Sequence, residues 1–251
     1  MALPSSLRLG VLTPSSNTAL EPLTSAIVAG LPGASAHFSR FRVTEISLQP
    51  EALGQFDDSK ILQAAELLAD ARVDVIGWSG TAAGWRGFDS DLRLIERIHQ
   101  STGIVATTAI LALNELLRFQ GIRRIALVTP YTADVQQRIV ANYARMGIEV
   151  VAERHLGISV NHDFALVSPK TLLGLIDEVA LAKPEAVATY CTNLHAAQLA
   201  TEVESRLDIA LLDTVSTTVW GMLRAAGADA SKVQGWGRLY GWGAAQAVTQ
   251  P

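Results

Sequence analysis

The stretch Arg8–Pro14, RLGVLTP, reappears in the second half of the chain as Arg124–Pro130, RIALVTP. A second pair follows in the same order, because Val73–Thr81, VDVIGWSGT, matches Glu185–Asn193, EAVATYCTN. The two registers differ by 116 and 112 residues, so the spacing between the motifs is nearly the same in each half. An internal repeat of this size predicts two similar lobes related by a pseudo-twofold axis. Equivalent loops of the two lobes would then face one another across a cleft.

The composition is that of a folded protein with an ample core. The chain has 251 residues, of which 49% are hydrophobic and 18% charged, and its net charge is −4. No basic stripe predicts nucleic-acid binding, and no polybasic segment predicts a membrane surface. The start, Met1–Ser6, lacks the apolar core of a signal peptide, and the most apolar stretch, Ile104–Leu117, is too short to span a bilayer. A single cysteine excludes an intramolecular disulfide, so we expect a reducing, cytoplasmic location.

Short β-rich apolar runs alternate with segments whose apolar residues recur at three-and-four spacing, which indicates βαβ units and a parallel sheet. The expected strands are Leu9–Thr13, Ala36–Val43, Val73–Gly77, Ile125–Thr129, Glu149–Glu153, Ala186–Tyr190 and Ile209–Leu212. The expected helices include Ile61–Leu68, Asp134–Tyr143, Ser168–Ala180 and Asn193–Arg206.

The predicted fold is therefore α/β, with two pseudo-symmetric lobes, each a mostly parallel sheet flanked by helices, and an active site in the cleft between them. We assign residues 1–113 and 216–251 to the N-terminal lobe and residues 114–215 to the C-terminal lobe. A hinge is expected around Gln120–Arg123. The sequence allows a homo-oligomer but does not establish one, because nothing in it marks an interface.

The loop after the first expected strand, Thr13–Thr18, has two interpretations. Its Ser, Asn and Thr residues are typical of a turn and a helix N-cap. The same loop suits an anion cradle, in which backbone N–H groups and hydroxyls point at a carboxylate. The chain has neither a G-x-G-x-x-G motif nor a Walker loop, so the anion need not be a nucleotide phosphate.

The loop around the only cysteine carries the main chemical signal. A lone cysteine is usually a small buried hydrophobe. Cys191, however, follows an expected buried strand and precedes an expected helix, whose N-terminus would lower the pKa of the thiol. Thr192 and Asn193 would add donors for an oxyanion, and Ser79, Gly80 and Thr81 occupy the matching loop of the first half.

Tyr131 follows the second copy of the Thr-Pro motif, at the position that matches Ser15. It is either a packing aromatic or a phenol that donates to a carboxylate or an enediolate. The five histidines form no set with metal-ligand spacing, and we expect no metal. Arg40 and Arg42 are either solvated charges at a strand end or partners of a substrate carboxylate.

Over nearly its whole length the chain resembles the Asp/Glu racemase superfamily, in the branch of the maleate isomerases and arylmalonate decarboxylases. The motifs that carry the resemblance are Pro14–Thr18, Val128–Tyr131, Leu156–Ile158 followed by Asn161, Cys191–Leu194 and Gly235–Leu239.

This resemblance implies chemistry without a cofactor, in which a malonate-type acid passes through an enediolate held by hydrogen bonds. It implies Cys191 and Ser79 as catalytic residues. It also implies a set of substrate-binding residues: Pro14, Ser15, Asn17, Gly80, Thr81, Tyr131, Asn161, Thr192 and Asn193.

Racemases and isomerases of this group use two cysteines, one in each lobe, whereas the decarboxylases keep only the second. This chain has the second, Cys191, and lacks the first, whose place is taken by Ser79 or by Gly80. We therefore expect a decarboxylase of a substituted malonate-type dicarboxylic acid that protonates the enediolate with Cys191. The alternatives are a maleate cis–trans isomerase, an Asp/Glu-type racemase and a non-catalytic carboxylate-binding protein. The expected partner in each case is a small carboxylate or dicarboxylate.

Overall fold

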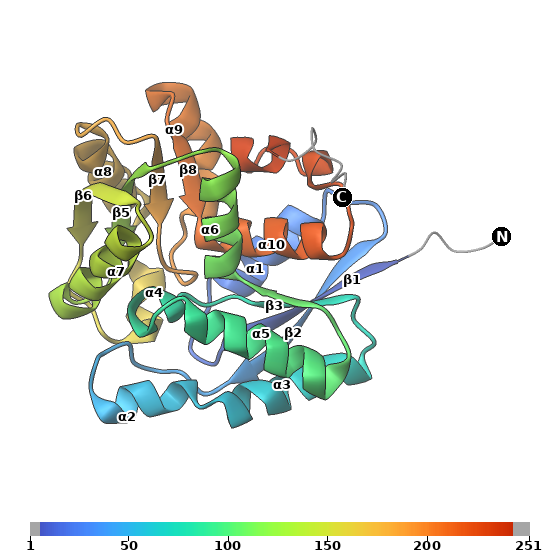
Figure 1. The fold of residues 1–251 in the computed structure, drawn as a ribbon. Helices are drawn as coiled ribbons and strands as arrows, with labels where there is room; N and C mark the ends of the chain where they lie inside the picture. Colours follow the sequence, from blue (N-terminus) through green and yellow to red (C-terminus); the bar gives the residue numbers. More distant parts are fainter. Residues whose placement is uncertain (1–5, 243–251) are drawn as a thin grey trace.

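The computed structural model describes residues 6–242, which form two four-stranded parallel sheets (Figure 1). The first sheet has the order β2-β1-β3-β4 and the second the order β6-β5-β7-β8, so both lobes share one topology. The predicted fold class is confirmed. The strands are β1 Leu7–Pro14, β2 Ala34–Phe41, β3 Val75–Trp78, β4 Ala106–Thr108, β5 Arg124–Thr129, β6 Glu149–His155, β7 Ala186–Thr189 and β8 Ala210–Asp213.

Helices cover both faces of each sheet, which explains why the central strands are apolar along their whole length. Leu9, Val11 and Leu12 of β1 and the run Ile125–Val128 of β5 have no exposed surface. The helices are α1 Leu20–Val28, α2 Pro50–Leu53, α3 Asp58–Asp70, α4 Ala83–Arg86, α5 Asp89–Thr102, α6 Ala109–Phe119, α7 Ala133–Arg145, α8 Pro169–Ala180, α9 Ala200–Leu207 and α10 Thr214–Ala225. None of the helices within residues 6–242 is long and apolar enough to cross a membrane.

Helix α10 joins the two lobes. It follows β8 of the second sheet but packs against α6, α1, β3 and β4 of the first, and Figure 1 shows it beside α6. The chain thus returns to the first lobe at the start of this helix. The predicted lobe boundary at 113/114 falls inside α6, and residues 243–251 lie outside the described part, so the division of the chain stays a prediction. Gly121, in the expected hinge, has a φ of +66° just after α6.

Two elements differ from the sequence prediction. Strand β4 was not expected, because its three residues are too short for a periodic signal and α6 follows without a turn. The helix expected over Asn193–Arg206 begins later, since Thr192–His195 form turns and bends before the short 3-10 helix Ala197–Leu199 and α9. The reason is that the side chain of Asn193 bonds to the other lobe instead of to its own backbone.

Candidate active site

Loops at the carboxyl ends of β1, β3, β5 and β7 are tied together by hydrogen bonds between the lobes. Thr192 Oγ1, after β7, donates to the carbonyl oxygen of Ser79, after β3, at 3.0 Å. Thr192 Oγ1 itself accepts from Asn17 Nδ2, after β1, at 3.2 Å. Thr81 Oγ1 and the Tyr131 hydroxyl are 2.6 Å apart. The loops that the sequence repeat paired therefore meet at one place, where parallel sheets bring strand ends together.

Tyr131 is held firmly where these loops meet. The edge contacts of its ring with Trp85 and Phe164 have centroid distances of 5.2 and 5.6 Å. Only 2% of the residue is exposed. Burial raises the pKa of its phenol well above the ordinary value, and the nearby Cys191 adds to that rise. The hydroxyl thus keeps its proton and can donate it in a hydrogen bond to an oxyanion.

The thiol of Cys191 lies beside this phenol and is also buried. Burial raises the pKa of the thiol to about 12, although hydrogen bonds from the Tyr131 hydroxyl and from the backbone N–H of Asn193 oppose the rise. The sequence-based expectation of a lowered thiol pKa is wrong, because burial outweighs the effects that lower it, and the loop after Cys191 is a turn at which no helix begins. At neutral pH the group is a thiol with its proton in place, which suits a proton donor better than a nucleophile.

Backbone donors surround the two side chains. Within residues 6–242 the N–H groups of Thr81, Ala82 and Thr192 have no hydrogen-bond acceptor, although all three residues are buried. Buried N–H groups without a partner are rare, because each costs the free energy of a lost hydrogen bond. Fixed donors of this kind can stabilise a negatively charged oxygen. Ala82 is a donor that the sequence analysis did not identify, because a backbone donor has no side-chain signature.

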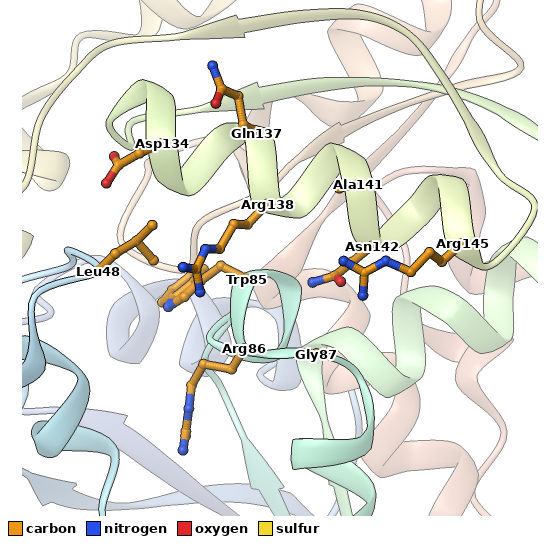
Figure 2. Close-up of a pocket in the computed structure, with 10 residues that line it drawn as sticks. All are labelled: Leu48, Trp85, Arg86, Gly87, Asp134, Gln137, Arg138, Ala141, Asn142 and Arg145. Carbon is orange, nitrogen blue, oxygen red and sulfur yellow. The ribbon is translucent and has the colours of Figure 1, made fainter.

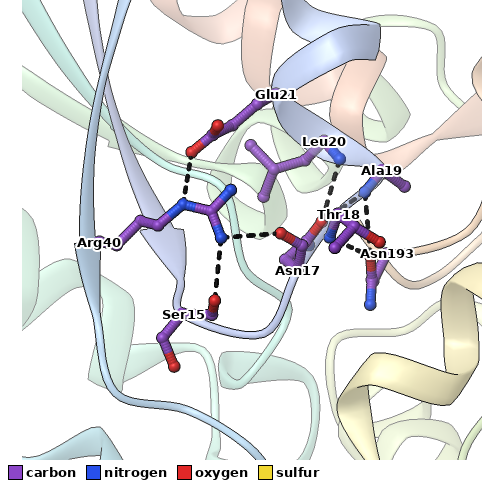
Figure 3. A network of polar contacts seen from close by, with 8 residues as sticks. All are labelled: Ser15, Asn17, Thr18, Ala19, Leu20, Glu21, Arg40 and Asn193. Carbon is purple, nitrogen blue, oxygen red and sulfur yellow. Dashed lines mark hydrogen bonds and ion pairs between the residues drawn. The ribbon is translucent and has the colours of Figure 1, made fainter.

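Asn193 ties the second lobe to the first with its side chain (Figure 3). Its Oδ1 accepts from the backbone N–H of Thr18 at 2.9 Å and of Ala19 at 3.1 Å. Its Nδ2 donates to the carbonyl oxygen of Asn161 at 2.5 Å. The residue was predicted to bind substrate, but three of its side-chain contacts are with protein backbone, and it has no exposed surface.

We expect Asn193→Ala to lower the free energy of unfolding by about 2–4 kcal/mol, because it removes three hydrogen bonds, two of them between the lobes, and leaves the N–H of Thr18 and the carbonyl oxygen of Asn161 without these partners, whereas Ala19 keeps its bond to Asn17. The matched control is Asn142→Ala, since Asn142 is a buried amide with one bond between the lobes, from Nδ2 to the Gly84 carbonyl oxygen at 2.7 Å. That change should cost about 1–2 kcal/mol. Urea unfolding of both variants measures the two losses. Equal losses would contradict the role of Asn193 as the main bond between the lobes.

The loop after β1 behaves as a helix cap. Asn17 Oδ1 accepts from the backbone N–H of Ala19 and of Leu20, both at 3.0 Å. Arg40 holds the outer side of the loop, because its Nη1 donates to the carbonyl oxygens of Ser15 and Asn17 and its Nε pairs with Glu21 at 2.8 Å (Figure 3). The guanidinium of Arg40 therefore supports the loop and does not face the cleft residues.

The remaining loop residues predicted to bind substrate are close to the cleft but are bonded to protein. Pro14 is buried, and its carbonyl oxygen accepts from Asn17 at 3.0 Å. Ser15 Oγ bonds with the backbone of Val43. Asn161 Nδ2 donates to Ser16 Oγ at 2.8 Å, which joins the lobes at a second point. A substrate carboxylate at this loop would have to compete with these contacts.

Ser79 and Gly80 are the two residues that could occupy the place of the first-lobe cysteine, and their surroundings differ. The hydroxyl of Ser79 lies 3.5 Å from Thr218 Oγ1 on α10, and within residues 6–242 it forms no hydrogen bond with Cys191. Gly80 lies under the ring of Trp78, and a Cβ added to it would come within 2.1 Å of that ring. Trp78 is in turn packed against Phe41 with ring centroids 5.0 Å apart. Position 80 therefore has no room for a side chain.

Two buried carboxyl groups were not predicted from the sequence. Asp213 caps α10 by accepting from the backbone N–H of Val215 and Ser216, and it also accepts from Thr189 Oγ1 at 2.9 Å. Asp91 accepts from Thr108 Oγ1. Burial raises the pKa of both to about 7. The charge of Asp213 also contributes to the raised pKa of Cys191. Within the described residues, no group of three His, Cys, Asp or Glu side chains could hold a metal ion.

Comparison with known proteins gives a consistent result. The family model described as arylmalonate decarboxylase matches residues 23–240. The arylmalonate decarboxylase of Bordetella bronchiseptica is 29% identical over 197 residues, which cover 77% of this chain and 82% of that enzyme. The maleate isomerase of Geobacillus stearothermophilus is 25% identical over 232 residues, or 87% of this chain and 91% of that enzyme. The crystal structure of the maleate isomerase Iso from Pseudomonas putida S16 superposes with a TM-score of 0.87 at 28% identity, covering 95% of this chain and 99% of that one.

Proposed function

This chain belongs to the arylmalonate decarboxylase family, and from that premise we propose that it decarboxylates a substituted malonate-type dicarboxylic acid without a cofactor. The observation that carries the proposal is the state of Cys191. It is a single thiol, buried, with a pKa of about 12, and beside it is the phenol of Tyr131. An acid that keeps its proton until a carbanion forms needs this arrangement.

The reaction needs one proton donor and an oxyanion site. One carboxylate of the malonate leaves as carbon dioxide when its bond to the α-carbon breaks, and the electron pair moves into an enediolate on the remaining carboxylate. The N–H groups of Thr81, Ala82 and Thr192, together with the Tyr131 hydroxyl, would hold the two enediolate oxygens. Cys191 then gives its proton to the α-carbon, and the thiolate regains a proton from solvent. The apolar rings of Trp78 and Trp85 would disfavour the ionised carboxylate and so assist its loss.

Isomerisation and racemisation fit the site less well. Both require a thiolate or a second thiol, as the two-cysteine members of the group imply. Here burial disfavours the thiolate of Cys191, and the Trp78 ring fills the space next to Gly80. The substrate-binding roles of Pro14, Ser15, Asn17, Asn161 and Asn193 stay part of the proposal, as residues that shape and close the cleft around the bound acid.

Proton NMR in D2O with a mixture of malonates, maleate, aspartate and glutamate tests the proposal directly. We expect the signals of one malonate to disappear and a monocarboxylic acid with one deuterium at its α-carbon to appear. Fumarate formed from maleate, or deuterium exchange into an amino acid, would overturn the proposal in favour of an isomerase or a racemase. Incubation without enzyme is the control, because some malonates lose carbon dioxide spontaneously.

A further inference from the structure

A groove of about 500 Å³ lies between α4 of the first lobe and α7 of the second (Figure 2). Its volume is in the range of small-molecule sites. Neither Cys191 nor Tyr131 lines the groove, and the ring of Trp85, which does line it, packs against Tyr131 in an edge-to-face contact. The other residues used in the argument are Arg138, Arg145, Ala141 and Leu48.

Two arginines on α7, Arg138 and Arg145, line the groove, and the pKa of Asp134 is lowered by the hydrogen bond from Thr132 and, to a smaller extent, by the charge of Arg138. Arg138 and Arg145 are seven residues apart, which places them two helical turns apart on one face, with a separation of about 10 Å along the axis. Figure 2 shows both side chains extending from α7 toward α4. Neither guanidinium has an ion pair or a hydrogen bond within residues 6–242. Ala141 lies between them and leaves space on the same face.

The other charges of the groove are already engaged. Arg86 donates to the carbonyl oxygen of Phe56 at 3.4 Å and lies over the Phe56 ring, so it points away from α7. Asp134, the one carboxylate among the lining residues, accepts from Thr132 Oγ1 at 2.6 Å. The groove therefore offers two guanidinium groups and a positive net charge to an incoming anion.

A buried donor gives the second indication of a ligand. The indole Nε1 of Trp85 is buried and has no hydrogen-bond acceptor in the structure, and only 3% of the residue is exposed. A buried N–H without an acceptor has a free-energy cost that a bound anion or carbonyl oxygen would remove. The same ring, with Leu48, provides apolar surface for the body of a small molecule.

We propose that this groove binds a small organic dianion, with one anionic group at Arg138, the other at Arg145 and an oxygen at Trp85 Nε1. Guanidinium groups bind carboxylates and phosphates through two parallel hydrogen bonds, so both kinds of group fit. The spacing of the two arginines selects a ligand whose charges are separated by a short chain. This site does not depend on the proposed decarboxylase activity.

The test uses glutarate, acetate and inorganic phosphate as probes at constant ionic strength, with the indole N–H signals of the full chain followed by NMR. Trp85→Phe identifies the Trp85 signal. We expect glutarate to shift this signal and to bind at least tenfold more tightly than acetate or phosphate. The double variant Arg138→Gln/Arg145→Gln should bind glutarate at least tenfold more weakly. The control is Arg93→Gln, which replaces an arginine of α5 outside the groove and should leave the affinity for glutarate unchanged.

Two results would overturn the proposal. Glutarate binding that survives the double variant would place the dianion elsewhere, including at the site around Cys191, and Tyr131→Phe, which removes a proposed oxyanion donor of that site, identifies that case by weakening the binding. Equal affinity for glutarate, acetate and phosphate would exclude a ligand with two separated charges. Both arginines are exposed helix residues, so the variants should fold, and circular dichroism checks this.

Discussion

Replacing Cys191 with alanine is expected to lower kcat by two to four orders of magnitude, because the step that protonates the enediolate loses its acid. Binding of the substrate should change little, since the oxyanion donors at Thr81, Ala82 and Thr192 belong to the backbone and stay in place. The measurement is the rate of monocarboxylate formation, together with the dissociation constant of the substrate or of a product-like acid. A loss of binding without a loss of kcat would contradict the assigned role.

Ser79→Ala provides the comparison for this result. The hydroxyl of Ser79 lies near Thr218 on α10 and, within residues 6–242, forms no hydrogen bond with the thiol, so we expect kcat to stay within a few-fold of the wild-type value. Cys191→Ser is the more demanding test. A serine hydroxyl has nearly the shape of the thiol but is a far weaker acid, so a variant that binds normally and turns over slowly would identify proton donation as the function of position 191. If Ser79→Ala were as inactive as Cys191→Ala, Ser79 would have to take part in the reaction.

The second large effect is a dependence of stability on pH that originates in Asp213. Burial raises the pKa of this carboxyl from 3.8 to about 7 in the folded state. Between these two values the folded protein holds a proton that the unfolded chain has released. Stability contributed by this group is therefore greatest below about pH 4 and falls as pH rises to about 7. A shift of about three pKa units corresponds to about 4 kcal/mol.

Asp213→Asn should remove the part of this dependence that comes from Asp213 and leave the part that comes from Asp91, whose pKa burial also raises to about 7. Asparagine can still cap α10 by accepting from the N–H groups of Val215 and Ser216, so the variant keeps the helix start. Urea unfolding at pH 5 and pH 8 gives the difference in free energy for each protein. The difference should be smaller in Asp213→Asn than in the wild type, and unchanged in Asp70→Asn, which alters an exposed carboxyl at the end of α3. An equal difference in all three proteins would show that Asp213 does not hold a proton in the folded state.

Asp213 also connects stability with the site. It ends β8, next to the strand that leads to Cys191, because Thr189 and Asp213 are partners in the sheet. When Asp213 ionises, its charge disfavours the thiolate of Cys191, which keeps the proton on sulfur. The destabilising buried carboxyl thus supports the protonated state that the proposed reaction uses, a common relation between strain and function at active sites.

Most of the fold could be predicted from the sequence, because an internal repeat and the spacing of apolar residues are local patterns that can be recognised without the structure. The repeat of Arg8–Pro14 at Arg124–Pro130 marks an inner strand of each sheet, β1 and β5, and apolar periodicity marks α3, α7, α8 and part of α9. The missed strand β4 and the late start of the helix after Cys191 have one cause. Each depends on contacts with residues far away in the sequence, which periodicity does not report.

For the candidate site, the order of the residues along the chain already shows which loops carry the polar residues and that one thiol is present. The identity of a residue and its place at a strand end are local properties. Tertiary structure alone decided what those groups can do. It placed Tyr131 beside Cys191 and buried both, so that the thiol stays protonated. It also placed the Asn193 amide in hydrogen bonds with the other lobe and the ring of Trp78 next to Gly80. A pKa, a free backbone donor and a filled space arise from atoms that the chain brings together only when it folds, and for that reason no stretch of sequence contains them.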